Sequence, residues 1–153
     1  MRVEDIMTKN VSFCAPGTNA AAAAEIMWMR DCGVLPVVED SGQIVGVVTD
    51  RDLFIALGTQ NRNPSELPVG EIMRRELSAC APEDDVRDVL KTMAEQRVHR
   101  LPVLDKSGAL KGIVSMNDVI LQETNGVFKN DVIRTLKAIC QHRQAGQSKL
   151  AGA

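Results

Sequence analysis

The segment GVVTDRD, residues 46–52, ends an apolar run with four polar side chains, Thr49, Asp50, Arg51 and Asp52. Three kinds of chemistry suit these residue types. Carboxylates serve acid–base catalysis or bind metals. A hydroxyl and a carboxylate one helical turn apart suit the phosphate and ribose of a nucleotide. The same residues are also common at the start of a helix, where they cap free backbone N–H groups.

A repeat of 66 residues runs through the chain without a gap. VEDIM at 3–7 aligns with VGEIM at 69–73, and CAP at 14–16 aligns with CAP at 80–82. GVLPVVEDSGQIVGVVTDRD at 33–52 aligns with HRLPVLDKSGALKGIVSMND at 99–118. Matches in separate blocks indicate a duplicated unit. Ser115 and Asp118 therefore stand where Thr49 and Asp52 stand.

Each copy predicts the order strand, helix, strand, strand, helix. The polar pairs at 18–19 and 84–85 suit helix N-caps. The helix that follows has an apolar stripe in copy two, and copy one matches it with small residues. The stripes are Val86, Val89, Leu90 and Met93, and Ala20, Ala23, Ala24 and Met27. LPVV and LPVL predict buried strands, Ser-Gly predicts a hairpin turn, and a second helix begins at Asp50 or Asn117.

These elements set the expected organisation of the chain. We predict a first repeat over 1–58, a polar linker over 59–68 and a second repeat over 69–123. A C-terminal helix is expected over 124–143, with a flexible tail over 144–153. The apolar face of this helix comprises Val132, Leu136, Ile139 and Cys140.

The two copies resemble a known family, the tandem CBS domain pair or Bateman module. The Leu-Pro-Val strand, the Ser-Gly hairpin and the closing Gly-x-x-[Ser/Thr]-x-x-Asp carry the resemblance, over residues 1–123. The closing motif is Gly46, Thr49 and Asp52 in one copy and Gly112, Ser115 and Asp118 in the other. The resemblance implies an α+β fold with two repeats packed about a pseudo-twofold axis. It also implies two clefts that bind adenine nucleotides or related adenosyl ligands.

The chemistry of the motif agrees with this implication. One carboxylate can accept hydrogen bonds from both hydroxyls of a ribose, the role expected of Asp52 and Asp118. A hydroxyl at a helix N-terminus suits a phosphate, the role expected of Thr49 and Ser115. Capping alone is the alternative for both pairs. Arg51 is a further phosphate candidate, whereas Asp50 is expected to be a cap or a solvated charge.

The copies differ just before the Leu-Pro-Val strand. Copy two has His99 and Arg100 where copy one has Gly33 and Val34. In related modules a His-Arg pair at this place contacts the phosphates of the ligand, and a guanidinium matches phosphate oxygens well. The alternatives are a surface ion pair for Arg100 and a half-buried structural role for His99. We therefore expect unequal ligand sites, with a weaker affinity for phosphate in copy one.

The first helix of copy one carries apolar residues beyond its core stripe, at Ile26, Trp28 and Met29. Such a helix needs a second cover. CBS pairs commonly dimerise through their helices, so the resemblance implies a homodimer at this face. The alternative is that Trp28 packs beneath the C-terminal helix of its own chain.

Composition bounds the remaining function classes. The chain has 153 residues, a net charge of -2 and no apolar run of membrane-spanning length, so we expect a cytoplasmic protein without nucleic-acid or membrane partners. Its four cysteines lack CxxC spacing, which predicts reduced, mostly buried thiols and no metal. No nucleophile–base pair, HExxH motif or P-loop appears, so we expect no enzyme.

The expected function is that of a regulatory module. It would sense an adenosyl compound, namely AMP, ADP, ATP, NAD or S-adenosylmethionine, and signal to a protein partner that the sequence does not identify. AMP is the favoured ligand, and no cofactor is required. The alternative is a ligand-free dimerisation scaffold.

Overall fold

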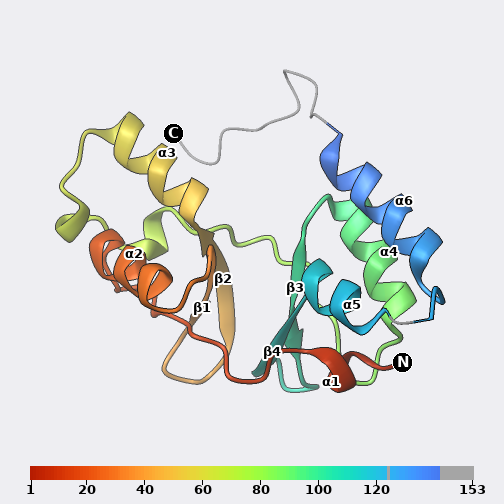
Figure 1. Ribbon diagram of the computed structural model, residues 1–153. Coiled ribbons are helices and arrows are strands. Elements are labelled where there is room, and N and C mark those ends of the chain that lie inside the picture. The colour runs from red at the N-terminus through yellow and green to blue at the C-terminus, as the bar shows by residue number, and fades with distance from the viewer. Residues whose placement is uncertain (124, 142–153) are drawn as a thin grey trace. The chain divides into compact units, whose positions relative to one another are not determined.

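The computed structural model describes residues 1–123 and 125–141, and it divides into two compact units (Figure 1). The first unit is Ser12–Leu77. The second unit joins residues 1–11 to the chain from Ser78 onward. Both units mix helices with a two-stranded antiparallel sheet, and a C-terminal helix follows the second repeat, so the predicted α+β class is confirmed.

The first unit is built on one β-hairpin. Strands β1 (Val34–Val38) and β2 (Ile44–Thr49) pair in a register that sets Val34 opposite Thr49. Gly42 has a φ of 84°, which the predicted Ser-Gly turn requires and which glycine adopts without strain. Helices α2 (Ala20–Met29) and α3 (Asp50–Gln60) lie on one face of this hairpin (Figure 1).

The second unit repeats this plan and adds to it. Its hairpin is β3 (Arg100–Leu104) with β4 (Leu110–Ser115), and its helices are α4 (Val86–Gln96) and α5 (Met116–Gln122). A short helix α1 (Val3–Ile6) precedes them in the chain. Helix α6 (Lys129–Cys140) packs along α4, as Figure 1 shows.

The predicted first strand of each repeat is reduced to a single bridge. Cys14 pairs with Val37 and Cys80 with Val103, each in parallel orientation. An Ala-Pro dipeptide follows each cysteine, and proline lacks the N–H that a longer ladder needs. The first strand of the predicted order is therefore present in each repeat only as this bridge.

The predicted helical stripes form the two cores. Val86, Val89, Leu90 and Met93 are all buried, as are Ala20, Ala23 and Met27. Ala24 is exposed, contrary to expectation, although its counterpart Leu90 is buried. The reason is α6, whose buried Thr135 donates a hydrogen bond of 3.1 Å to the Leu90 carbonyl. In the first unit the short 3₁₀ turn Pro64–Glu66 contacts α2 from the corresponding segment.

The units exchange the segments that begin the sequence repeats. Thr8 pairs with Ile113 through backbone hydrogen bonds of 2.9 and 3.0 Å, so the start of repeat one lies in the second unit. Arg74 pairs with Val47 through bonds of 3.0 and 2.8 Å, so the start of repeat two lies in the first unit. The spatial units therefore differ from the sequence repeats at their N-terminal ends.

The segment expected to be a linker is partly structured. Helix α3 continues to Gln60, and the 3₁₀ turns Pro64–Glu66 (η1) and Val69–Glu71 (η2) follow it. Leu67 is fully buried in the first core. The predicted tail over 144–153 lies outside the described residues, as do residues 124, 142 and 143 of the predicted C-terminal helix.

The packing of the N-terminal segment against Gly112 predicts that Gly112→Ala lowers the stability of the second unit. A Cβ at this buried glycine would lie 2.7 Å from the Thr8 carbonyl oxygen and 2.9 Å from Met7 Sδ. The crossing segment would have to move, at a cost of about 1–3 kcal/mol in the free energy of unfolding. Urea denaturation measures this cost.

Gly58→Ala is the matched control for that experiment. Gly58 lies in helix α3 with open space at its Cβ position, so alanine should raise stability by about 0.5–1 kcal/mol. Equal unfolding midpoints for Gly112→Ala and wild type would contradict the close approach of the Met7–Thr8 segment.

Candidate functional site

The motif of the first repeat forms a helix cap at the carboxyl end of β2. Thr49 is the N-cap of α3, and its Oγ1 accepts a hydrogen bond of 3.1 Å from the Asp52 N–H. Asp52 Oδ2 accepts in return from the Thr49 N–H at 3.0 Å and from Thr49 Oγ1 at 2.7 Å. The two side chains therefore form a reciprocal capping box. Both side chains therefore act as caps of α3.

The second repeat builds the same cap at the end of β4. Ser115 Oγ accepts from the Asp118 N–H at 3.3 Å, and Asp118 Oδ2 accepts from the Ser115 N–H and Oγ, each at 2.7 Å. In both caps the carboxylate uses one oxygen for its helix. What surrounds the other oxygen, Oδ1, decides whether the carboxylate can take a ligand.

The two carboxylates differ at this second oxygen. Arg74 donates to Asp52 Oδ1 through Nε at 3.0 Å and Nη2 at 2.7 Å. Among the residues that the structure describes, none donates to Asp118 Oδ1. Thr8 occupies the position that corresponds to Arg74 in the repeat. Asp118 therefore keeps an acceptor oxygen for a ligand, and Asp52 does not.

The structure brings the predicted cations of copy two to the Ser115 cap. Arg100 is the strand partner of Ser115, and the His99 carbonyl accepts a hydrogen bond of 2.9 Å from the Met116 N–H. The His99 side chain is exposed and Arg100 is half-buried. Neither side chain has a hydrogen bond or ion pair to any described residue, which argues against both structural alternatives.

The corresponding place in the first unit holds an acid. A Cβ at Gly33 would lie 2.9 Å from Asp50 Oδ2, so the Asp50 carboxylate stands over the glycine that replaces His99. Asp50 Oδ1 also accepts from the Arg51 N–H at 2.7 Å. The Arg51 side chain is exposed. The place of His99 in the second unit is therefore taken in the first unit by a carboxylate, which would repel an anionic ligand there.

We call Thr49, Asp52 and Arg74 the first half-site, and Ser115, Asp118, His99 and Arg100 the second half-site. Arg74 was missed by the sequence analysis. The signal was present in the repeat, because Arg74 aligns with the small polar Thr8.

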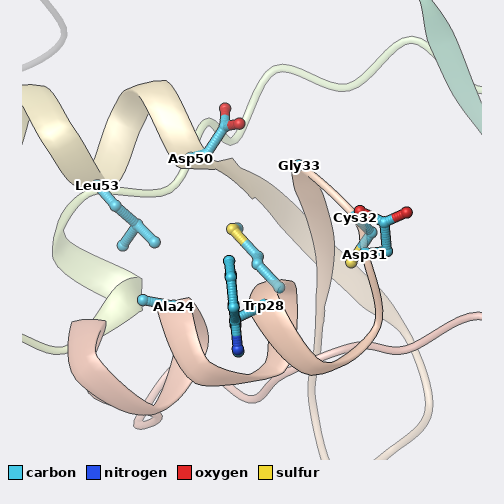
Figure 2. A pocket seen from close by; sticks show the side chains of 8 residues that line it. Ala24, Trp28, Asp31, Cys32, Gly33, Asp50 and Leu53 are labelled. Carbon is cyan, nitrogen blue, oxygen red and sulfur yellow. The ribbon is translucent and has the colours of Figure 1, made fainter.

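A shallow cavity of about 460 Å³ lies in the first unit, between α2, the start of α3 and the loop before β1 (Figure 2). Ala24 and Trp28 line it from α2, and Asp50 and Leu53 line it from α3. Neither Thr49 nor Asp52 lines it. The cavity therefore belongs to the helical face of this unit and lies apart from the first half-site.

That helical face is apolar and uncovered in the single chain. Trp28 is 85% exposed, Phe54 78% and Met29 73%. Ile26, predicted to join them, is half-buried and packs against the first core. The C-terminal helix α6, the alternative cover for Trp28, has its buried side on α4 within the second unit.

The cysteines show how burial controls thiol chemistry. Burial raises the pKa of Cys14 to about 11, and burial with a smaller effect of the Asp84 charge raises the pKa of Cys80 to about 12. All four thiols are free; Cys14 is buried, Cys32 and Cys80 are half-buried and Cys140 is exposed, so the thiols are less buried than expected. Within residues 1–123 and 125–141, no three His, Cys, Asp or Glu side chains gather as metal ligands.

Comparison with known proteins identifies the family. The sequence model of the CBS domain matches residues 3–59 and again residues 69–123. The chain belongs to the CBS domain family. The CBS domain-containing protein YhcV of Bacillus subtilis is 34% identical over 121 residues, which cover 79% of this chain and 84% of YhcV.

Two solved CBS structures were determined with adenosyl ligands. The CBS domain pair of protein MJ0100, in complex with 5-methylthioadenosine and S-adenosyl-L-methionine, has a TM-score of 0.73 and 25% identity, covering 80% of this chain and 94% of that chain. CBSX2 in complex with AMP has a TM-score of 0.69 and 29% identity, covering 79% and 94%. CBS pairs of this fold therefore include proteins that bind adenosyl compounds.

Proposed function

We propose that the chain is a regulatory CBS pair that binds an adenosyl ligand, with AMP favoured, and that it signals the occupied state to a protein partner. The observation that carries this proposal is the second half-site. There a carboxylate oxygen of Asp118 without a donor lies in the first turn of α5, and the Arg100 guanidinium and the His99 imidazole at the adjoining start of β3 have no partner among the described residues. A ribose diol would donate hydrogen bonds to the free carboxylate oxygen, and a phosphate would accept them from the Arg100 and His99 side chains.

The charge of the second half-site supports a nucleotide over a neutral nucleoside. Arg100 is paired across the strands with Ser115, whose hydroxyl already caps α5. A phosphate near this cap would gain a guanidinium and the N-terminal end of a helix. NAD, ADP, ATP and S-adenosylmethionine share the ribose, so the carboxylate alone does not choose among them.

The uncovered face of α2 and α3 supports a homodimer. Three large apolar side chains stand exposed there, whereas α6 covers the corresponding helix in the second unit. A second copy of the chain, presenting the same face, would bury them. This face also favours the alternative function, a dimerisation scaffold that needs no ligand.

Native mass spectrometry of freshly purified protein, followed by thermal melting with AMP, ADP, ATP, NAD and S-adenosylmethionine, tests the proposed function. At about one hundred times its Kd, a ligand should stabilise the fold by roughly 2.7 kcal/mol and raise Tm. If none of the five ligands moves Tm at millimolar concentration, the scaffold replaces the sensor.

Three further expectations stay predictions. No described helix is long and apolar enough to cross a membrane. We further propose that the protein is cytoplasmic. The expected lack of enzymatic activity, and of a metal or required cofactor, likewise awaits assay.

A further inference from the structure

The Asp52 carboxylate is fully engaged within its own unit. A carboxylate has about four lone-pair positions for hydrogen bonds. Thr49 fills two of them at Oδ2 through its N–H and Oγ1, and Arg74 fills two at Oδ1 through Nε and Nη2. The Asp52 side chain is only 12% exposed, which leaves little room for a further donor. A ribose diol cannot be added to this arrangement without removing a partner.

Arg74 is the partner that can leave. The Thr49 contacts are part of the helix cap, so breaking them would fray α3. The Arg74 side chain is 47% exposed, and its backbone is held independently by two hydrogen bonds to Val47. Rotation of this one side chain would free Oδ1 and leave the strand and the cap in place.

We infer that Arg74 is a specificity-determining residue of the first half-site, which occupies the ligand position on Asp52 and must be displaced before a ribose can bind. This inference rests on the proposed function. Every diol that binds at Asp52 has to replace a two-donor, charge-assisted contact, and no such cost arises at Asp118. The first half-site is therefore weakened by a residue of its own unit, in addition to lacking the His99 and Arg100 cations.

The repeat suggests two reciprocal substitutions, at positions 8 and 74, that test the inference. Thr8 lies at the matching position in the second unit, with matching backbone bonds to Ile113, and both Thr8 and Arg74 are exposed. Arg74→Thr makes the first half-site resemble the second, and Thr8→Arg does the reverse. Arg75→Thr is the control, because it removes the same charge from a neighbouring guanidinium that bonds the Gly70 carbonyl.

Adenosine is the appropriate probe, because it carries the ribose without a phosphate whose attraction to arginine would confuse the result. An NMR titration reports the two half-sites separately, through the backbone amides of Thr49 and Asp52 and those of Ser115 and Asp118. Arg74→Thr should tighten adenosine binding at the first pair of amides about three- to tenfold. Thr8→Arg should weaken binding at the second pair, and Arg75→Thr should match wild type.

Two results would overturn the inference, and they are distinguishable. If adenosine binds at the Ser115 and Asp118 amides but Arg74→Thr leaves the first half-site unchanged or weaker, Arg74 is no competitor and the proposed function stands. If adenosine shifts neither pair of amides in any of the four proteins at millimolar concentration, the nucleoside sites themselves are refuted, and the role of Arg74 with them.

Discussion

Asp118→Ala is expected to weaken AMP binding at the second half-site at least tenfold, whereas Asp52→Ala should change the affinity of that half-site little. Asp118 Oδ1 has no donor among the described residues, so it is the free acceptor for a ribose, and Asp52 Oδ1 is already held by Arg74. Charge-assisted hydrogen bonds to an ionised group contribute about 1.5–3 kcal/mol, and 1.4 kcal/mol corresponds to tenfold in Kd. Isothermal titration calorimetry with AMP measures the difference.

The two substitutions control for each other. Each removes the carboxylate from a reciprocal capping box of the same geometry, so each should cost about 0.5–2 kcal/mol of stability through the cap, and Asp52→Ala also loses the Arg74 contact. Arg100→Ala should also strongly weaken AMP binding at the second half-site. Equal AMP affinities at two sites per chain, both weakened equally by Arg100→Ala, would show that the cations serve both ligands and that the assignment of unequal sites is wrong.

Trp28→Glu is expected to prevent the proposed homodimer from forming. Trp28 is the most exposed of the large apolar side chains on α2 and α3, and a dimer through this face would bury it. A glutamate there would place an unpaired charge in an apolar contact, at a cost of several kcal/mol of association free energy. Sedimentation velocity at several protein concentrations measures the change in the monomer–dimer equilibrium.

Leu121→Glu serves as the control for that experiment. Leu121 lies on α5 in the second unit and is 78% exposed. Leu121→Glu therefore introduces the same charge on a helix outside the proposed face. We expect it to leave association unchanged. A monomeric wild type, or a dimer that Trp28→Glu does not affect, would refute a homodimer through this face.

The helix caps and core stripes could be predicted because they are local. A cap joins residues three apart, and the stripe of α4 repeats every three or four residues, so both are visible in a short segment. The burial of Leu90 followed from the stripe, but the exposure of its counterpart Ala24 did not. That difference depends on α6, which packs on α4 some forty-five residues along the chain.

The contact between Arg74 and Asp52 was invisible for a similar reason. The two residues are 22 positions apart, and they meet because the segment at 69–74 returns to the sheet of the first unit. A duplicated sequence suggests that each repeat folds on itself, and the exchange of N-terminal segments breaks that assumption. The local caps predicted the two candidate binding places. The exchange of N-terminal segments, which brings Arg74 to Asp52, determines which carboxylate keeps a free oxygen.

A crystal structure of the chain grown with millimolar AMP tests the central claim most directly. We expect AMP at the second half-site, with its ribose hydroxyls donating to Asp118 Oδ1 and its phosphate beside Arg100 and His99. The first half-site should be empty or less occupied, with Arg74 still on Asp52 wherever it is empty. AMP bound at Asp52 with Arg74 displaced, while Asp118 stays without ligand, would contradict the account.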